Sequence, residues 1–190
     1  MSYLFKCYSR QYDSFMKKFN LDKNQVIVRS LKNISGLEVL DIGGGTGTLA
    51  KELISLGAKV TILDPEINMT KIAKEKSNEV KIINGYSNNI KLKDSSIDII
   101  IMRDSFHHIM QKEETLEECK RVLKKEGKIL IYEFDKKSLI GKVIFIFETL
   151  CFERIKMISI DEMKDLTYKY FKNGQIRKIS EYEYIYLGEK

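Results

Sequence analysis

The sequence predicts an α/β protein with a parallel, doubly wound sheet, and three observations carry that prediction. Short apolar runs typical of strands alternate with helical patterns along most of the chain. A glycine-rich turn at 43–47 joins the first apolar run to the helical pattern after it. The run 97–102 is apolar at all positions but one, as in a strand that is buried on both faces. Repeated strand–helix units of this kind form a parallel sheet with helices on both faces.

The individual elements follow from the spacing of apolar residues, which differs between strands and helices. Strands are expected at 38–42, 59–63, 80–83, 97–102 and 129–132. Helices are expected at 21–33, 46–56, 110–125 and 160–171, with a further helix that opens at Asp64-Pro65-Glu66. Gly57 and Gly127 fit the ends of two of these helices, and Asp22 fits a helix cap. Near the end of the chain, 175–187 reads as two short strands with tyrosines at alternate positions.

The composition is that of an ordinary globular protein with one domain. Its 190 residues are 32% charged and 43% hydrophobic, with a net charge of +6. The three cysteines form no CxxC pair, and the two histidines are adjacent, which argues against structural zinc and disulfides and fits a reducing cytoplasm. The segment 1–20 lacks the apolar core of a signal peptide. Because the lysines are spread along the chain and form no basic block, we expect no nucleic-acid partner. From the cysteines, the histidines and the first 20 residues together, we expect a cytoplasmic protein without a metal ion.

The glycine turn is the most informative stretch of the chain. Gly43, Gly45 and Gly47 form a GxGxG pattern, whereas the dinucleotide fingerprint is GxGxxG, and its last glycine would fall at Thr48. No lysine follows the glycines at the offset that a phosphate loop requires. Asp41, two positions before the first glycine, would repel a pyrophosphate but suits a cation. The turn therefore favours a ligand that carries sulfonium and ammonium groups over a dinucleotide.

The stretch from Val39 to Gly47, VLDIGGGTG, resembles the first motif of class I S-adenosylmethionine-dependent methyltransferases. The resemblance extends from about Tyr12 to the C-terminus, and it is nearest to the small-molecule branch that includes the ubiquinone/menaquinone-biosynthesis C-methyltransferases. It implies a Rossmann-like fold with a mostly parallel seven-stranded sheet and a C-terminal antiparallel hairpin. It implies S-adenosylmethionine as cofactor and S-adenosylhomocysteine as product. The expected organisation is a single domain over 1–190, with an N-terminal helical lid at 1–35, a cofactor-binding core at 36–135, and C-terminal helices and hairpin at 136–190.

The resemblance also implies a cofactor site at the carboxyl ends of the strands. Asp41 would orient the turn and the amino group of the cofactor, and Gly43, Gly45 and Gly47 would shape its methionine side. Asp64 can accept hydrogen bonds from the two ribose hydroxyls; as an alternative, it caps the next helix, with Pro65 in the first turn. The full predicted cofactor set is Asp41, Gly43, Gly44, Gly45, Asp64, Pro65, Tyr86, Ser87, Arg103 and Tyr12.

The loop after the third predicted strand departs from the family pattern. Tyr86 stands where the resemblance leads us to expect an acid that binds the adenine amino group. Tyr86 can stack on adenine, Asn88 or Asn89 can supply an amide acceptor, and the backbone N–H of Ser87 is also available. The alternative is a structural Tyr86 that packs under the loop.

Residues that can act on the methyl acceptor follow the fourth and fifth predicted strands. Arg103 can hold the carboxylate of the cofactor and Asp104 can face the acceptor, with surface ion pairs as the alternative for both. His107 is a candidate base for a phenol or enol, because its ordinary pKa is near neutrality; packing at the helix entry is its alternative. Glu133 and Asp135 are alternative bases at the same edge.

Two aromatic-rich segments can form the acceptor pocket. One lies near the N-terminus around Tyr12, and the other is 139–152, which is too short and too charged to cross a bilayer. The simpler prediction for 139–152 is a helix that packs on the sheet. The more specific hypothesis is a lid that covers the methyl acceptor. The predicted function is methyl transfer to a small, aromatic or hydrophobic acceptor at carbon or oxygen, by a protein able to form a homodimer. The alternatives are an RNA or protein methyltransferase, a non-catalytic cofactor-binding regulatory subunit and, weakest, an NAD-dependent dehydrogenase.

Overall fold

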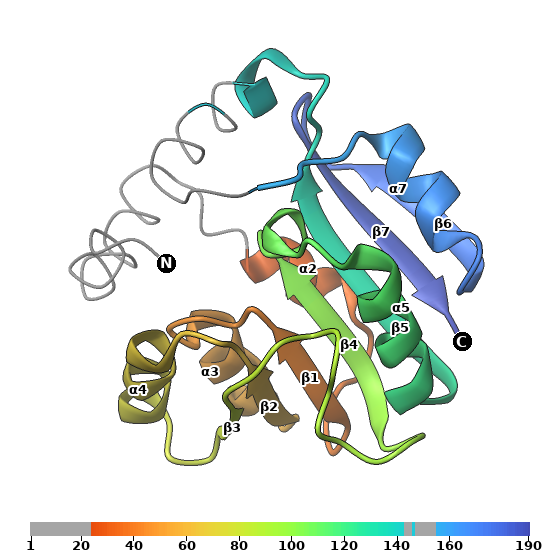
Figure 1. Cartoon of the computed structure of the whole chain (residues 1–190). Helices are drawn as coiled ribbons and strands as arrows, with labels where there is room; N and C mark the ends of the chain where they lie inside the picture. The colour runs from red at the N-terminus through yellow and green to blue at the C-terminus, as the bar shows by residue number, and fades with distance from the viewer. Residues whose placement is uncertain (1–23, 143–145, 147–154) are drawn as a thin grey trace.

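The protein is built on a seven-stranded sheet, which a computed structural model describes over residues 24–142, 146 and 155–190. The strands are β1 (Glu38–Ile42), β2 (Lys59–Leu63), β3 (Lys81–Ile83), β4 (Ile97–Arg103), β5 (Leu123–Phe134), β6 (Lys172–Lys178) and β7 (Glu183–Glu189). Their order across the sheet is β3-β2-β1-β4-β5-β7-β6 (Figure 1). Neighbours from β3 to β5 are parallel, whereas β7 is antiparallel to both β5 and β6. The predicted mostly parallel sheet with a C-terminal antiparallel hairpin is confirmed.

Helices accompany the strands in the described part of the chain. They are α2 (Asn24–Ser30), α3 (Thr48–Ser55), α4 (Ile67–Lys76), α5 (Lys112–Val122) and α7 (Ile160–Thr167), with a short 3-10 helix η1 (Phe106–His108). Three of them, α3, α4 and α5, connect parallel strands. The start of the helix predicted at 21–33, including the Asp22 cap, lies outside the described residues. Within the part of the chain that the structure describes, no helix combines the length and the apolar character needed to cross a membrane.

Two predicted helix boundaries are wrong. The helix after β2 begins at Ile67, because Glu66 is its N-cap and accepts a hydrogen bond from the backbone N–H of Asn68 at 3.2 Å. The alternative in which Asp64 caps this helix therefore fails. The helix predicted to run to 125 ends at Val122, since the next residue adopts extended backbone and joins β5.

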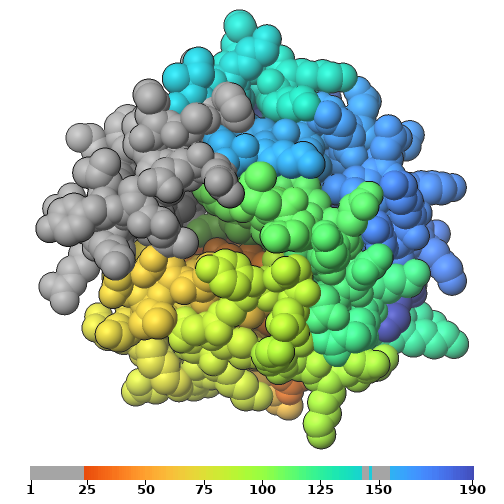
Figure 2. All heavy atoms as spheres, in the orientation of Figure 1, coloured from red at the N-terminus to blue at the C-terminus, as the bar shows by residue number. Residues whose placement is uncertain are grey.

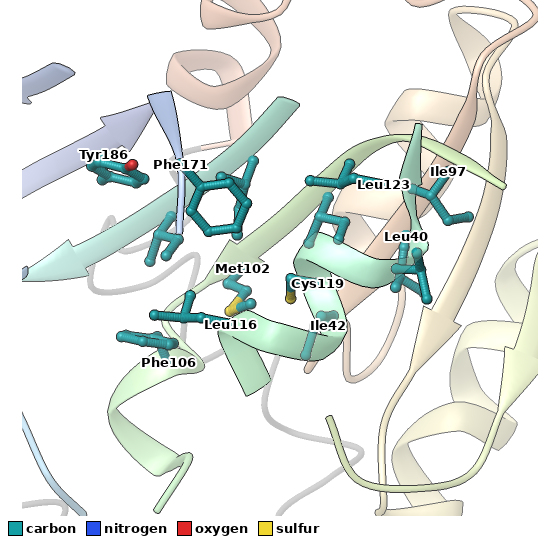
Figure 3. Packing of buried hydrophobic residues seen from close by; sticks show 14 of the residues in the cluster. Leu40, Ile42, Ile97, Met102, Phe106, Leu116, Cys119, Leu123, Phe171 and Tyr186 are labelled. Carbon is teal, nitrogen blue, oxygen red and sulfur yellow. The ribbon is translucent and has the colours of Figure 1, made fainter. Parts of the chain in front are cut away.

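Both faces of the central strands are buried under helices. In β4, Ile100 and Met102 belong to an apolar cluster that includes residues of α5 and α7. Ile99 and Ile101, which point the other way, belong to a second cluster that includes residues of α2 and α3. Figure 3 shows the first cluster, with Met102 next to Leu116 of α5. This two-sided burial explains why the strand is nearly continuous in apolar residues.

The connections of the sheet place the site. The neighbouring strands β1 and β4 are followed by connections that run in opposite directions across the sheet (Figure 1). From β1 the chain passes through α3 to β2 on one side, and from β4 it passes through α5 to β5 on the other. Such a switch point opens a crevice outside the carboxyl ends of the strands. Figure 2 shows yellow and green residues facing each other across a hollow on this side of the molecule. Because β1 to β5 are parallel, the loops that follow them all begin at this carboxyl edge of the sheet.

Candidate functional site

The first glycine of the turn is required by the close approach of the chain after β4. Gly43 has φ of 73°, a left-handed value, and its N–H donates to the Leu63 carbonyl at 2.8 Å. The Ser105 hydroxyl donates to the carbonyl of Ile42 at 2.8 Å. A Cβ at Gly43 would lie only 2.4 Å from the Cβ of Ser105. The ends of β1, β2 and β4 are thus held together, and a side chain at position 43 would force them apart.

Gly45 differs from Gly43 because it faces open space. The nearest atom to a Cβ built at Gly45 is Cε of Met69, at 3.4 Å, and the φ of Gly45 is 52°. Its N–H donates to Oδ2 of Asp64 at 3.0 Å. The position therefore offers bare backbone to a ligand while one side chain from the end of β2 fixes its orientation.

Asp64 organises two backbone segments at once. Oδ2 accepts the hydrogen bond from Gly45, and Oδ1 accepts one from the backbone N–H of Glu66 at 2.8 Å. Burial raises the pKa of this carboxyl, and the two backbone hydrogen bonds oppose that rise. Each oxygen retains a further lone pair, so the carboxylate can also accept hydrogen bonds from ligand hydroxyls. The adjacent Pro65 is exposed at the rim.

Asp41 is a buried carboxyl whose negative charge is poorly compensated. Its side chain lies inside the site with 2% exposure, and among the described residues its Oδ2 makes no hydrogen bond. Burial raises its pKa from 3.8 to about 7, the Arg103 guanidinium opposes the rise, and the charge of Asp64 adds to it. A Cβ at Gly44 would lie 2.7 Å from Oδ2, so only glycine lets the turn pack this closely against the carboxylate. A bound ammonium group would satisfy this oxygen and relieve the cost of ionising it.

Arg103 lies inside the site at the end of β4. Its guanidinium donates to Oδ1 of Asn24, which is buried in α2, and its charge acts on Asp41. The next residue, Asp104, has φ of 49° and donates its N–H to the carbonyl of Tyr132 at 3.1 Å. Both predicted residues therefore lie in the turn that leaves β4, beside the crevice.

His107 and Glu133 form a buried pair. Nδ1 of His107 lies 2.7 Å from Oε2 of Glu133, and the backbone N–H of His107 donates to Oε1 at 3.1 Å. Both residues are 2% exposed. Burial alone would raise the pKa of Glu133, but the charge and hydrogen bonds of His107 lower it below its ordinary value. The sequence offered these two residues as alternative bases, whereas the structure makes them partners. Asp135 is half-buried and accepts a hydrogen bond from the backbone N–H of Lys137 at 3.1 Å.

Lys112 is a buried lysine beside the candidate site that the sequence analysis did not single out. Its Nζ donates to the carbonyls of Phe106 at 2.7 Å and Ile109 at 2.5 Å, and it lies 4.9 Å from the centre of the Phe106 ring. Burial lowers its pKa to about 8, and the nearby charge of Glu133 opposes that fall. Lys112 thus caps the η1 turn that carries His107. A lysine at the start of a charged helix is ordinarily solvent-exposed, so the sequence contained no signal for this role.

The loop after β3 exposes its aromatic residue. The side chain of Tyr86 is 71% exposed, so the alternative in which it packs under the loop is wrong. The neighbouring Ser87 is buried, and its hydroxyl lies 2.8 Å from that of Thr115. Tyr12 and most of 139–152 lie outside the described residues. Within the described ranges no group of three or more His, Cys, Asp or Glu side chains is placed to hold a metal ion.

Comparison with known proteins identifies the relatives of this arrangement. The methyltransferase domain family matches residues 40–131. An uncharacterized methyltransferase of Anoxybacillus flavithermus is 28% identical over 176 residues, which cover 88% of this chain and 81% of that protein. The ubiquinone/menaquinone biosynthesis C-methyltransferase UbiE of Hahella chejuensis is 27% identical over 129 residues, covering 63% of this chain. The matched region is about half of UbiE, at 49% of its length.

A solved structure shares the fold along the whole chain. A Thermotoga maritima protein, described as a SAM-dependent methyltransferase and possible histamine N-methyltransferase, superposes with a TM-score of 0.81. The two chains are 22% identical, and the match covers 100% of each. The sheet, its hairpin and the switch point are therefore those of a known methyltransferase architecture.

Proposed function

Because the chain is a class I S-adenosylmethionine-dependent methyltransferase, similar to the ubiquinone/menaquinone-biosynthesis C-methyltransferases, we propose that it methylates a small hydroxyaryl or enol compound at oxygen or carbon. The relative named above supports an aromatic, hydrophobic acceptor. The buried His107–Glu133 pair beside the crevice supports an acceptor that must lose a proton. A basic net charge alone gives no comparable support to an RNA or protein acceptor.

The cofactor supplies a methyl group that its sulfonium has already activated, so the protein has to bind, align and exclude water. In this proposal Asp41 holds the ammonium group, and Arg103 holds the carboxylate of the same methionine moiety. The backbone at Gly45 lies against the cofactor, and Asp64 accepts hydrogen bonds from the ribose hydroxyls. Tyr86 stacks on the adenine, a role that its 71% exposure leaves it able to perform.

One observation carries this assignment: a buried carboxylate oxygen of Asp41 that makes no hydrogen bond within the described residues, next to an open glycine position. A buried charge of this kind is unfavourable unless a ligand with positive charge completes the site. Glycine at 45 leaves bare backbone for that ligand, since a Cβ there would come no closer than 3.4 Å to another atom. The cationic methionine moiety of the cofactor matches both features.

Calorimetry with S-adenosylhomocysteine tests the binding site. We expect Asp64→Ala to weaken binding more than tenfold, which corresponds to at least ~1.4 kcal/mol. Asp161→Ala is the matched control, because Asp161 is an exposed acid that pairs with Lys137 on the surface of α7. An unchanged dissociation constant in Asp64→Ala contradicts the ribose assignment. Binding of NADH, with no heat from either S-adenosyl compound, would overturn the proposed function itself.

Transfer of a labelled methyl group to a panel of acceptors tests the substrate class. The panel should contain catechols, hydroxyquinones and enols, with anilines, thiols and tRNA as comparison groups. We expect turnover within the first set. Transfer restricted to tRNA, or to an amine or thiol, would refute the proposed acceptor class even if cofactor binding were normal.

A further inference from the structure

The two oxygens of Glu133 are both engaged by one residue. Oε1 accepts the backbone N–H of His107 at 3.1 Å, and Oε2 lies 2.7 Å from Nδ1 of the same residue. The position of the imidazole is therefore fixed at two points relative to the carboxylate. An ionised carboxylate can only accept hydrogen bonds, so this contact requires the ring proton on Nδ1. In the neutral ring, the lone pair then resides on Nε2.

The pairing of strands β4 and β5 brings Glu133 and His107 together. Glu133 lies near the end of β5, and His107 lies in η1, just after the end of β4. The two strands are parallel neighbours, with Arg103 opposite Tyr132. Their carboxyl ends therefore bring residues 26 positions apart to the edge where the crevice opens.

Groups from several elements of the fold surround the His107–Glu133 pair. Lys112, which caps the η1 turn, is close enough to Glu133 for their charges to interact. The backbone N–H of Lys156 donates to the carbonyl of His107 at 2.8 Å. The ring of His108 is tilted by 49° from that of His107, with 4.1 Å between the ring centres, and the charge of Glu133 contributes to raising the pKa of the Tyr184 phenol. Lys112 therefore adds positive charge near Glu133, and the hydrogen bonds from His107 also favour the ionised form of the carboxylate.

We propose that Glu133 is a positioning residue for the methyl-transfer reaction: it holds His107 in the tautomer protonated at Nδ1, so that Nε2 accepts the proton that the methyl acceptor loses. This inference rests on the proposed function. The acceptor hydroxyl gives its proton to Nε2 and its oxygen keeps the electron pair, which makes the acceptor a stronger nucleophile. The resulting imidazolium is stabilised by the carboxylate, and it returns the proton to water after the product leaves.

The charge of Glu133 also has a direct consequence for acidity. A carboxylate 2.7 Å from the ring favours the imidazolium over the neutral imidazole. A glutamine at 133 keeps the size of the side chain and one oxygen acceptor, but it removes the charge. We therefore expect Glu133→Gln to make the protonated His107 at least tenfold more acidic.

Nuclear magnetic resonance of the protein labelled with ¹⁵N-histidine tests the proposal without any acceptor. The chain has only two histidines, so the long-range ¹H–¹⁵N spectrum contains two rings, and His108→Gln assigns them. We expect wild-type His107 to show the tautomer protonated at Nδ1. A proton on Nε2 in the neutral ring would overturn the proposal, and this result needs no variant at position 133.

The matched control removes another buried carboxylate from the same sheet. Glu183 is 3% exposed and accepts a hydrogen bond from the Tyr132 hydroxyl at 2.6 Å, so Glu183→Gln perturbs the core to a similar degree. We expect the His107 titration to move in Glu133→Gln and to stay unchanged in Glu183→Gln. Equal behaviour of the two variants would mean that Glu133 is merely structural.

Binding and turnover separate this inference from the proposed function. We expect both glutamine variants to bind S-adenosylhomocysteine like the wild type, while Glu133→Gln alone lowers kcat and moves the acid limb of the pH profile to lower pH. Loss of S-adenosyl binding by the wild type would refute the proposed function. A normal kcat and pH profile in Glu133→Gln, with a hydroxyaryl acceptor that turns over, would refute the role of Glu133.

Discussion

Replacing Asp41 with asparagine should stabilise the protein in the absence of its cofactor. Burial raises the pKa of Asp41 from 3.8 to about 7, against the opposing charge of Arg103. Each pH unit of such a rise corresponds to ~1.4 kcal/mol of unfavourable interaction with the charged form. A rise of roughly three pH units therefore means that ionised Asp41 costs the folded protein about 4 kcal/mol above pH 7. Asparagine has nearly the same shape and cannot ionise.

The sign of the pH dependence follows from where the proton is held more tightly. Folding raises the pKa of Asp41, so its contribution to stability is fully present below pH 4 and is lost as the pH rises to about 7. Carboxyls whose pKa is lowered, such as Glu133, act in the opposite sense, but both proteins contain them. The difference in unfolding free energy between variant and wild type therefore isolates Asp41. We expect the advantage of the variant to grow by roughly 2 to 3 kcal/mol between pH 5 and pH 8.

Urea unfolding of the two proteins, followed by circular dichroism at several pH values, measures this difference. Asp161→Asn provides the control, because this exposed acid has no buried charge to relieve. Below pH 7 the affinity of the wild type for S-adenosylhomocysteine should increase with pH, since the ammonium group binds the ionised carboxyl. Asp41→Asn should bind weakly at every pH. A constant stability gap between pH 5 and pH 8 would refute the assignment of a buried, titrating carboxyl at this position.

Three further predictions concern the turn and the adenine loop. Gly43→Ala should lower the unfolding free energy by ~2–5 kcal/mol in urea melts, because its left-handed backbone disfavours alanine and its Cβ would also meet the Cβ of Ser105 at 2.4 Å; Gly43→Ala combined with Ser105→Gly should recover part of the loss. Gly45→Ala has room for its methyl group, so it should lose only about 1–2 kcal/mol of stability but bind S-adenosylhomocysteine more than tenfold more weakly in calorimetry. Tyr86→Ala should leave stability within ~0.5 kcal/mol of the wild type, because the side chain is 71% exposed, and should weaken binding by roughly threefold to tenfold. Equal stability losses at Gly43 and Gly45, or unaltered binding in Tyr86→Ala, would contradict these interpretations.

The strands were predictable because their apolar runs are buried on both faces. β1 and β2 begin and end at the residues expected from the sequence. The end of α5 was not predictable in the same way. Leu123 is fully buried and pairs with Ile97 as part of a strand, yet its spacing from Leu116 also suits the apolar face of a helix. An apolar residue that reaches the same core from either conformation gives no local signal for the boundary.

The site was predictable as a set of positions but not as a set of contacts. The carboxyl ends of parallel strands gather at one edge, so the glycine turn, Asp64 and Arg103 could be assigned to one site from their order alone. The pairing of His107 with Glu133 depends on the register between β4 and β5, and the bond from Ser105 to Ile42 spans 63 positions. Neither the register nor the side-chain directions are encoded in local spacing. Contacts of this kind emerge only when the sheet is assembled.

The two acids of the proposed cofactor site differ in how far the protein compensates their charge, and this difference favours the binding of a cation. Asp64 accepts hydrogen bonds from two backbone N–H groups, so the protein itself compensates part of its charge. Asp41 lies under the same turn, but its Oδ2 makes no hydrogen bond within the described residues, and burial raises its pKa to about 7. The electrostatic cost is therefore concentrated on one carboxyl, whereas the other maintains the shape of the turn. A ligand cation at Asp41 would recover that cost as binding energy, while an anionic pyrophosphate would increase it, which is the physical basis for the proposal that this turn holds a methyl donor and not a dinucleotide.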